Sequence, residues 1–422
     1  TALYASQWLY TYQNCLLMAY TPPNVYYAST FNGTYTKLDG VQSVSIKRGK
    51  SRFQDPTPVS QCSIELIPQS TFPSMTVGQF IDIRDSNSGS SSAYFVGKIT
   101  DIDRSYAIPY NAGTGAAPGD RVTITVTGGT GVLASGSGSS GYGAGIAVDA
   151  TYTLMTGSMA VTQVYTTTPQ NIGYNYGVFG NPVPIGQNIL PPDVAPWLDT
   201  INKVLNTIQY SADDLDLNRT FKNNPINIAN VYAGVYFYPT GQTGKSISLV
   251  DDGSTGSTVY KYANIEYASS VQSAFTQILV QYQSFGVGGY TSVEANRRVG
   301  DAPYVGFSYP TVAATTTQAN SLGDYVLTVN NQTSPVPFSI ATSTTQSEGV
   351  AALGKLAECP LGTAVTVKFR GTTVSATVSG ISASYYPDRA NIRLSLTPSL
   401  GTPFTLDSSA FGVLDTNRLG YS

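Results

Sequence analysis

The sequence predicts a mainly β protein in which two small β domains flank a mixed α+β middle region. Three observations predict this architecture. Apolar and polar residues alternate with a period of two over residues 41–126, and they do so again over residues 363–397. Tyr is abundant, with 30 residues, and Tyr suits the pleated surface of a sheet. Between the two alternating regions, one segment has the period of an amphipathic helix.

The first β domain is assigned to residues 1–135. Its strands are expected in short runs punctuated by Pro and Gly, as in an antiparallel sheet or a small barrel. Along each run, every second residue is apolar and should face the core. The clearest examples are Val44 and Ile46, then Cys62, Ile64 and Leu66, and then Val122, Ile124 and Val126.

The middle region is assigned to residues 136–310. It opens in a Gly/Ser-rich stretch, residues 131–148, which we expect to be a loop. A GxGxxG match at residues 136–141 lacks the following helix that a dinucleotide site needs, so no cofactor is expected. The predicted amphipathic helix carries one apolar face, and residues 230–250 are expected to form two strands around a turn. The helix face consists of Trp197, Ile201, Val204, Leu205 and Ile208.

The last region is assigned to residues 311–422. It is expected to begin with strands and to form a second small β domain. Its alternating positions include Val365 and Val367 and, further on, Ile392 and Leu394. A closing run follows Pro398.

Composition limits the function classes. Charged residues make up 11% of the chain, against about 25% in a typical soluble domain, and the formal net charge is −3. No basic block of the kind that binds nucleic acid is present. A surface rich in Tyr and hydroxyl side chains but poor in Lys and Glu is typical of interfaces. The composition therefore indicates a protein that is largely covered by neighbours.

Catalytic and metal-binding residue types are scarce. The chain contains no His, which excludes Ser–His–Asp and Cys–His nucleophile systems and the commonest metal ligand. Cys15, Cys62 and Cys359 are too far apart for a zinc knuckle and are expected to be buried thiols. No signal peptide and no membrane-spanning run is recognised, which predicts a soluble protein made in the cytoplasm.

Two clusters of carboxylates leave alternatives open. Asp213, Asp214 and Asp216 follow the predicted helix, and Asp251 and Asp252 precede a Gly at a turn. Each cluster fits a solvated turn, because Asp is a common turn residue. A structural cation or a pair of catalytic carboxylates is the alternative. Neither cluster has the register of a calcium-binding loop.

Two stretches together resemble a known family. "VQSVSIKRGKSRFQDPTPVSQCSIELIP" and the strands up to residue 135 are similar to the N-terminal barrel of phage tail hub proteins, which are often labelled minor tail proteins in phages of actinobacteria. The closing run "FTLDSSAFGVLDTNRLGY" is similar to the final segment of the same hubs. Val59-Ser60-Gln61 departs from the family's Ala-Gly-Thr pattern. The residues that carry the likeness include Arg48, Gly49, Lys50, Gly97, Asp407, Phe411, Gly412, Leu414, Asp415 and Leu419.

The resemblance implies a structural, non-enzymatic component of the phage tail tip, made in the host cytoplasm. Such hubs are trimers, and each chain supplies two tail-tube-like β-barrel domains, so that three chains match a six-fold tube on one side and a three-fold tip on the other. The implied partners are distal tail and tube proteins, the tape measure protein and other tip proteins. DNA would pass through the channel without specific binding. The closing run would be an assembly element with Phe411 and Leu414 buried, with no enzymatic or adhesin domain after it.

Three rival functions are considered. A distal tail ring protein is also β-rich, but it is typically a hexamer with one tube-like barrel per chain. A glycan-binding or receptor-binding tip protein would use Tyr and Asn, although only two Trp and no repeat are present. A cell-wall enzyme would have to depend on the acidic clusters alone.

Overall fold

The protein is described by a computed structural model of the chain. The described residues are 21–30, 33–52, 55–68, 72–84, 93–107, 119–135, 155–156, 173–176, 184–185, 197–208, 210–213, 234–239, 246–267, 276–286, 289–300, 302–311, 313, 315–330, 337–343, 356 and 359–398. Strands outnumber helices throughout these ranges, so the prediction of a mainly β chain is confirmed.

The strands between residues 24 and 127 form what we call the N-terminal β half. They lie in the order β3-β4-β7-β6-β5-β1-β2, and all their pairings are antiparallel. The predicted alternation is confirmed, because the apolar positions of β3, β4 and β7 are buried. The strands are β1 (Asn24–Ala28), β2 (Thr36–Lys37), β3 (Val41–Gly49), β4 (Gln61–Leu66), β5 (Phe80–Arg84), β6 (Ala93–Ser105) and β7 (Arg121–Thr127). A short helix, α2 (Gly129–Ser135), follows β7.

The C-terminal β half comprises β13–β15 and β19–β22. The two longest strands, β21 and β22, pair with each other at its centre, and β20 and β19 flank them. Three strands from earlier in the chain extend the sheet, since β13 pairs parallel with both β20 and β14, and β15 pairs antiparallel with β19. The bounds are β13 (Ser246–Val250), β14 (Val259–Lys261), β15 (Asn264–Tyr267), β19 (Pro337–Ser343), β20 (Ala364–Phe369), β21 (Thr372–Tyr385) and β22 (Ala390–Pro398).

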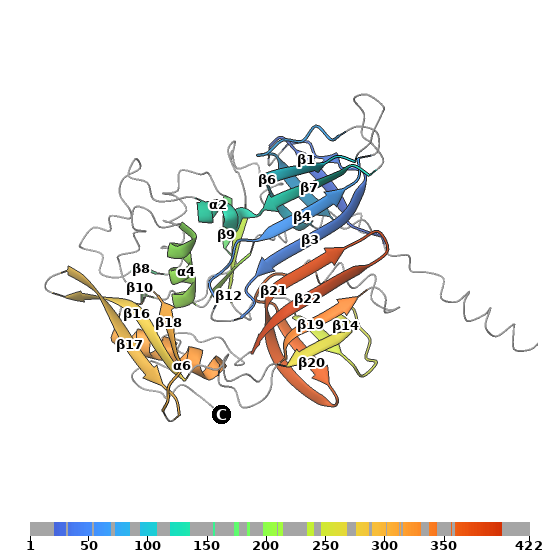
Figure 1. Cartoon of the computed structure of the whole chain (residues 1–422). Helices are drawn as coiled ribbons and strands as arrows, with labels where there is room; N and C mark the ends of the chain where they lie inside the picture. Colours follow the sequence, from blue (N-terminus) through green and yellow to red (C-terminus); the bar gives the residue numbers. More distant parts are fainter. Residues whose placement is uncertain are drawn as a thin grey trace, which may run out of the picture.

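The two β halves are joined edge to edge into one 14-stranded sheet, as Figure 1 shows for β3 and β21. β3 pairs antiparallel with β21, from Gly49 opposite Gly380 to Val44 opposite Tyr385. One core cluster extends through both halves, and Tyr94 stacks on Tyr385 at a ring distance of 5.5 Å. Among the described strands, no pairing closes either half into a barrel.

A separate unit is built on a long hairpin of β16 (Gln277–Gly286) and β17 (Gly289–Arg298). β18 (Gly306–Pro310) pairs parallel to β16, and α6 (Thr316–Asn330) packs on β16 and β17. Figure 1 shows α6 beside these strands, and the shared core contains Ile278, Val280, Leu322 and Val326.

The expectation of strands directly after Thr311 is wrong, because α6 occupies this segment. Thr315 caps the helix, since its hydroxyl oxygen accepts a hydrogen bond from the Gln318 N–H at 3.2 Å. Its buried positions recur at helical spacing, as in Ala319, Leu322 and Val326. The many Thr and Val residues of this segment favour strands locally, and packing against β16 and β17 overrides that preference.

The remaining middle elements are short. The predicted helix is confirmed as α4 (Trp197–Ile208). β11 (Tyr210–Asp213) follows it and pairs with β12 (Gly234–Pro239), which also pairs with β9 (Gly173–Tyr176). β8 (Met155–Thr156) pairs with β10 (Pro184–Ile185).

The predicted hairpin within residues 230–250 is wrong. Both strands exist as β12 and β13, but they do not pair with each other. β12 pairs with β11 and β9, whereas β13 pairs with β14 and β20 in the large sheet. The alternation of apolar residues predicted the strands, but it carries no information about which strand lies alongside.

The three-part linear division remains a prediction, although strand pairing and packing cross its boundaries. β13–β15 belong to the assigned middle region but pair with the C-terminal strands. α6 belongs to the assigned last region but packs on β16 and β17. A linear boundary cannot describe such an arrangement, because a sheet recruits strands from distant parts of the chain.

Candidate functional site: the joint between the two β halves

The sequence motif around Arg48 lies where the two β halves meet. Arg48 and Gly49 end β3 and are both buried, and Gly49 has a positive φ of 75°. Directly after them, the Lys50 N–H donates to the Ser379 carbonyl of β21 at 2.7 Å. We call Arg48, Gly49, Asp213, Leu361 and Gly380 the central joint.

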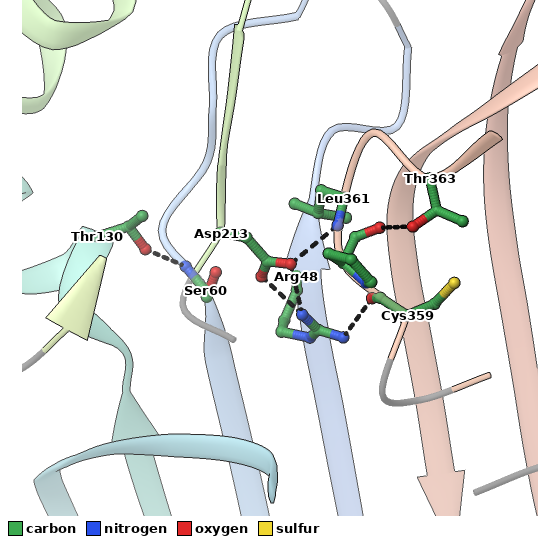
Figure 2. Close-up of polar contacts among 8 residues, drawn as sticks. Arg48, Ser60, Thr130, Asp213, Cys359, Leu361 and Thr363 are labelled. Atoms are coloured by element: carbon green, nitrogen blue, oxygen red, sulfur yellow. Dashed lines mark hydrogen bonds and ion pairs between the residues drawn. The ribbon is translucent and has the colours of Figure 1, made fainter. Parts of the chain in front are cut away.

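Arg48 forms a buried ion pair with Asp213, which is 165 residues further along the chain (Figure 2). The Arg48 Nη1 lies 2.6 Å from Asp213 Oδ1 and 2.8 Å from Oδ2. The two side chains are 1% and 0% exposed. A buried charge is stable only when it is paired and hydrogen-bonded, so each residue depends on the other.

The same two side chains also hold the segment that leads into β20. The Arg48 Nη2 donates to the Cys359 carbonyl at 3.3 Å, and the Leu361 N–H donates to Asp213 Oδ2 at 2.9 Å. Thr363 steadies this segment further, because its hydroxyl donates to the Pro360 carbonyl at 2.7 Å (Figure 2). One ion pair therefore ties together β3, β11 and the entry to β20.

Two glycines allow the backbones to approach closely at the joint. A Cβ on Gly49 would lie 2.4 Å from the Ser379 carbonyl oxygen, and a Cβ on Gly380 would lie 2.4 Å from the Lys50 carbonyl oxygen. Real Cβ atoms do not occupy such positions without movement of the backbone. The positive φ of Gly49 adds a second requirement for glycine.

Helices α2 and α4 support the chain just before β4. The Thr57 N–H donates to the Asn202 side-chain oxygen at 3.1 Å, and the Ser60 N–H donates to the Thr130 hydroxyl oxygen at 2.9 Å (Figure 2). Asn206, one turn further along α4, donates to the Pro310 carbonyl at 3.0 Å. The polar face of α4 thus links the N-terminal β half to the end of β18.

Gly97, the fourth N-terminal motif residue, lies within the N-terminal β half, away from the joint. A Cβ there would lie 2.6 Å from the Thr127 carbonyl oxygen and 2.8 Å from the Phe95 ring. Gly97 therefore permits β6 to pack tightly against β7. The motif residues of the closing run, Asp407, Phe411, Gly412, Leu414, Asp415 and Leu419, lie outside the described residues.

Burial shifts the pKa of two ionisable groups in this half of the sheet. Burial lowers the pKa of Lys50 to about 8, and the nearby Asp55 carboxylate partly opposes this effect. Burial raises the pKa of the Cys62 thiol, which keeps this thiol protonated and unreactive at neutral pH. Cys62 and Cys359 are buried free thiols, as predicted, and Cys15 lies outside the described residues.

The expected solvated turn at Asp213 is wrong, because this carboxylate is fully buried and paired with Arg48. Asp214 and Asp216 lie outside the described residues. Asp251 and Asp252 form an exposed turn, in agreement with the turn interpretation. The described residues contain no group of three or more His, Cys, Asp or Glu that could hold a metal ion.

Several joint residues could not be found from sequence. Leu361, Cys359 and Gly380 carry no local signal that would connect them to Arg48. Asp213 was noticed as a carboxylate, but its partner lies on another strand.

None of the helices in the described ranges is long and apolar enough to span a bilayer.

The comparisons with known proteins give a fold. No protein-family description matches the sequence, and no curated protein matches it. Among solved structures, the tail protein from Neisseria meningitidis MC58 aligns with a TM-score of 0.57 and 10% identity, over 90% of this chain and 97% of that one. The 43 kDa tail protein of prophage MuSo2 from Shewanella oneidensis aligns with a TM-score of 0.51 and 12% identity, over 88% and 98%. The chain therefore shares its fold with these two tail proteins.

Proposed function

We propose that the chain is a structural component of a phage tail tip, and specifically a trimeric hub that joins the six-fold tail tube to a three-fold tip. The observation that carries this proposal is the fold, which matches two tail proteins over nearly the whole length of each chain. The sequence resemblance at both ends of the chain points to the same class of protein. The role is structural rather than catalytic.

The joint supports a hub in which each chain supplies two ring units. Three copies with two β halves each would place six tube-like units around a channel. For this the two halves must keep a fixed relative orientation, and the β3–β21 pairing with the Arg48–Asp213 ion pair provides it. The tube-like character of each half is part of this proposal.

One face of the joined sheet suits a channel through which DNA slides. Ser384, Ser45, Ser63 and Thr125 lie side by side in register across β21, β3, β4 and β7. All four are exposed or half-buried, while the alternate positions are buried. Hydroxyl groups without a surplus of Lys or Arg give weak, sequence-independent contact with phosphates, since tight binding to DNA requires many cations. We propose that this hydroxyl row faces the channel.

The partners in this proposal are distal tail and tube proteins, the tape measure protein and other tip proteins, all within the virion. The test has two parts. The purified chain should have the mass of a trimer in analytical ultracentrifugation, and antibodies against it should label particles at the tail tip. A hexamer would favour the distal ring instead, and labelling along the tail shaft or on the head would contradict both.

A further inference from the structure

The β20–β21 hairpin ends in a strained two-residue turn. Phe369 pairs with Thr372, which leaves Arg370 and Gly371 as the connection, with φ angles of 47° and 82°. Positive φ at both positions is the pattern of a type I′ turn, for which Asn-Gly is the preferred sequence. Arg370 is the only non-glycine residue with a positive φ in the part of the chain that the structure describes.

The segment that connects β13 to β14 forms hydrogen bonds and an ion pair with this hairpin turn. The Arg370 N–H donates to Asp251 Oδ2 at 2.8 Å, and Lys368 Nζ lies 3.2 Å from Asp252 Oδ2. Asp252 also accepts a hydrogen bond from the Ser254 N–H at 2.9 Å. These contacts fix the backbone of the turn, so the strained conformation is maintained by its surroundings.

The Arg370 side chain carries an exposed charge at this turn. Its guanidinium lies 5.1 Å from the centre of the Phe369 ring, and the residue is exposed. Among the described residues, no carboxylate lies within ion-pair distance of it, whereas Lys368 is paired. A Cβ on Gly371 or Gly253 would meet nothing within 4 Å, so both turns face open space.

A large cation at this position is unfavourable for the isolated chain, because Asn or Gly would adopt the conformation with less strain. Strain that the surroundings maintain points to a function. We propose that Arg370 is an assembly contact that binds a carboxylate on a second copy of this chain. The proposal rests on the trimeric hub proposed above.

The chemistry favours a protein carboxylate over DNA. A guanidinium matches a carboxylate with two parallel hydrogen bonds, and the ring beneath it restricts its orientation. Asp251 and Asp252 lie beside the turn and repel any anion, but the repulsion is larger for a polyanion, which brings several charges close to them, than for a single carboxylate. The chain as a whole carries 25 acidic and 22 basic residues, so a neighbouring copy offers carboxylates in excess.

The first test separates stability from assembly. Arg370→Asn should raise the urea midpoint of the chain, because Asn tolerates the turn, and should weaken association of the copies at least tenfold. Arg389→Asn is the matched control, since Arg389 is an exposed hairpin-turn cation stacked 4.6 Å from Tyr386, but it is already paired with Asp388. It should leave association unchanged. Equal association of Arg370→Asn and the parent chain would overturn the proposal.

The second test identifies the partner. Arg370→Lys keeps the charge and supplies an amine that a zero-length carbodiimide reagent can link to a carboxylate. In trimers mixed from ¹⁴N-labelled and ¹⁵N-labelled chains, mass spectrometry should find peptides linked between differently labelled copies. Links confined to Asp251 or Asp252 of the same copy, or no link, would overturn the proposal. The proposal would also be overturned if Arg370→Asn lost DNA binding while the copies associated as in the parent chain.

The outcomes also separate this inference from the proposed function. A parent chain that stays monomeric at all concentrations would contradict both the trimer and this contact. A parent trimer whose association does not respond to Arg370 would contradict only the contact.

Discussion

Removing one partner of the Arg48–Asp213 ion pair should destabilise the joint strongly. In Arg48→Met, the Asp213 carboxylate loses both contacts with the guanidinium, while the hydrogen bond from the Leu361 N–H remains. The Cys359 carbonyl loses a donor as well. Leaving one member of a buried pair uncompensated costs about 3–5 kcal/mol. The free energy of unfolding of a native protein is about 5–15 kcal/mol, so this loss is a large fraction of the total.

The double variant Arg48→Met/Asp213→Leu should recover part of this loss. Neither charge of this pair remains, and apolar side chains of similar size can replace a buried ion pair at little net cost. The Leu361 N–H loses its contact with Asp213 and the Cys359 carbonyl its contact with Arg48, and a buried polar group that loses its hydrogen bond costs about 1–3 kcal/mol. The double variant should therefore be more stable than either single variant.

Urea unfolding followed by circular dichroism, on the parent and the three variants, measures this cycle. Arg121→Met is the matched control, because Arg121 pairs with Glu65 on the surface and is 58% exposed. Its replacement should change the free energy of unfolding by less than about 1 kcal/mol. The reasoning is refuted if Arg48→Met costs no more than this control, or if the two single effects simply add.

Three further predictions concern the joint and the hydroxyl row. Gly49→Ala should lower the urea midpoint more than Gly371→Ala, because both have a positive φ but only Gly49 would clash with the opposite strand; equal losses would contradict the close approach. The free energy of unfolding of the parent should rise relative to Lys50→Met between pH 8 and 10.5, because the folded pKa of about 8 lies below the ordinary 10.5 and the unfolded chain holds more protons in this window. Lys50 is partly exposed, so the rise should stay below about 3 kcal/mol, and a flat difference would contradict burial of the charge. Ser63→Lys should slow DNA ejection from single particles without changing the urea midpoint, and an unchanged ejection rate would contradict a channel-facing row.

Local patterns in the sequence predicted the elements well where burial is periodic. Ile64 and Leu66 alternate with polar residues in β4 and are buried, and the apolar spacing after Trp197 predicted α4. α6 was missed, because its Thr and Val residues favour strands locally and only tertiary packing makes the segment helical.

Long-range relations could not be predicted in the same way. Arg48 was singled out by its motif, but nothing near it in sequence indicates Asp213, and a carboxylate next to other carboxylates suggests a solvated turn. The pairing of β13 with β20 likewise depends on strands that are more than 100 residues apart. Side-chain alternation determines which face is buried, whereas strand order depends on the whole chain.

The central claim, a trimeric hub with two ring-forming β halves per chain, is tested most directly by electron cryo-microscopy of the tail tip. The account predicts three copies of this chain around the axis, with each copy supplying two adjacent β halves to a ring of six, and with Ser45 and Ser63 facing the channel. Six copies in one ring, each supplying one β half, or density for the chain outside the tail, would contradict it.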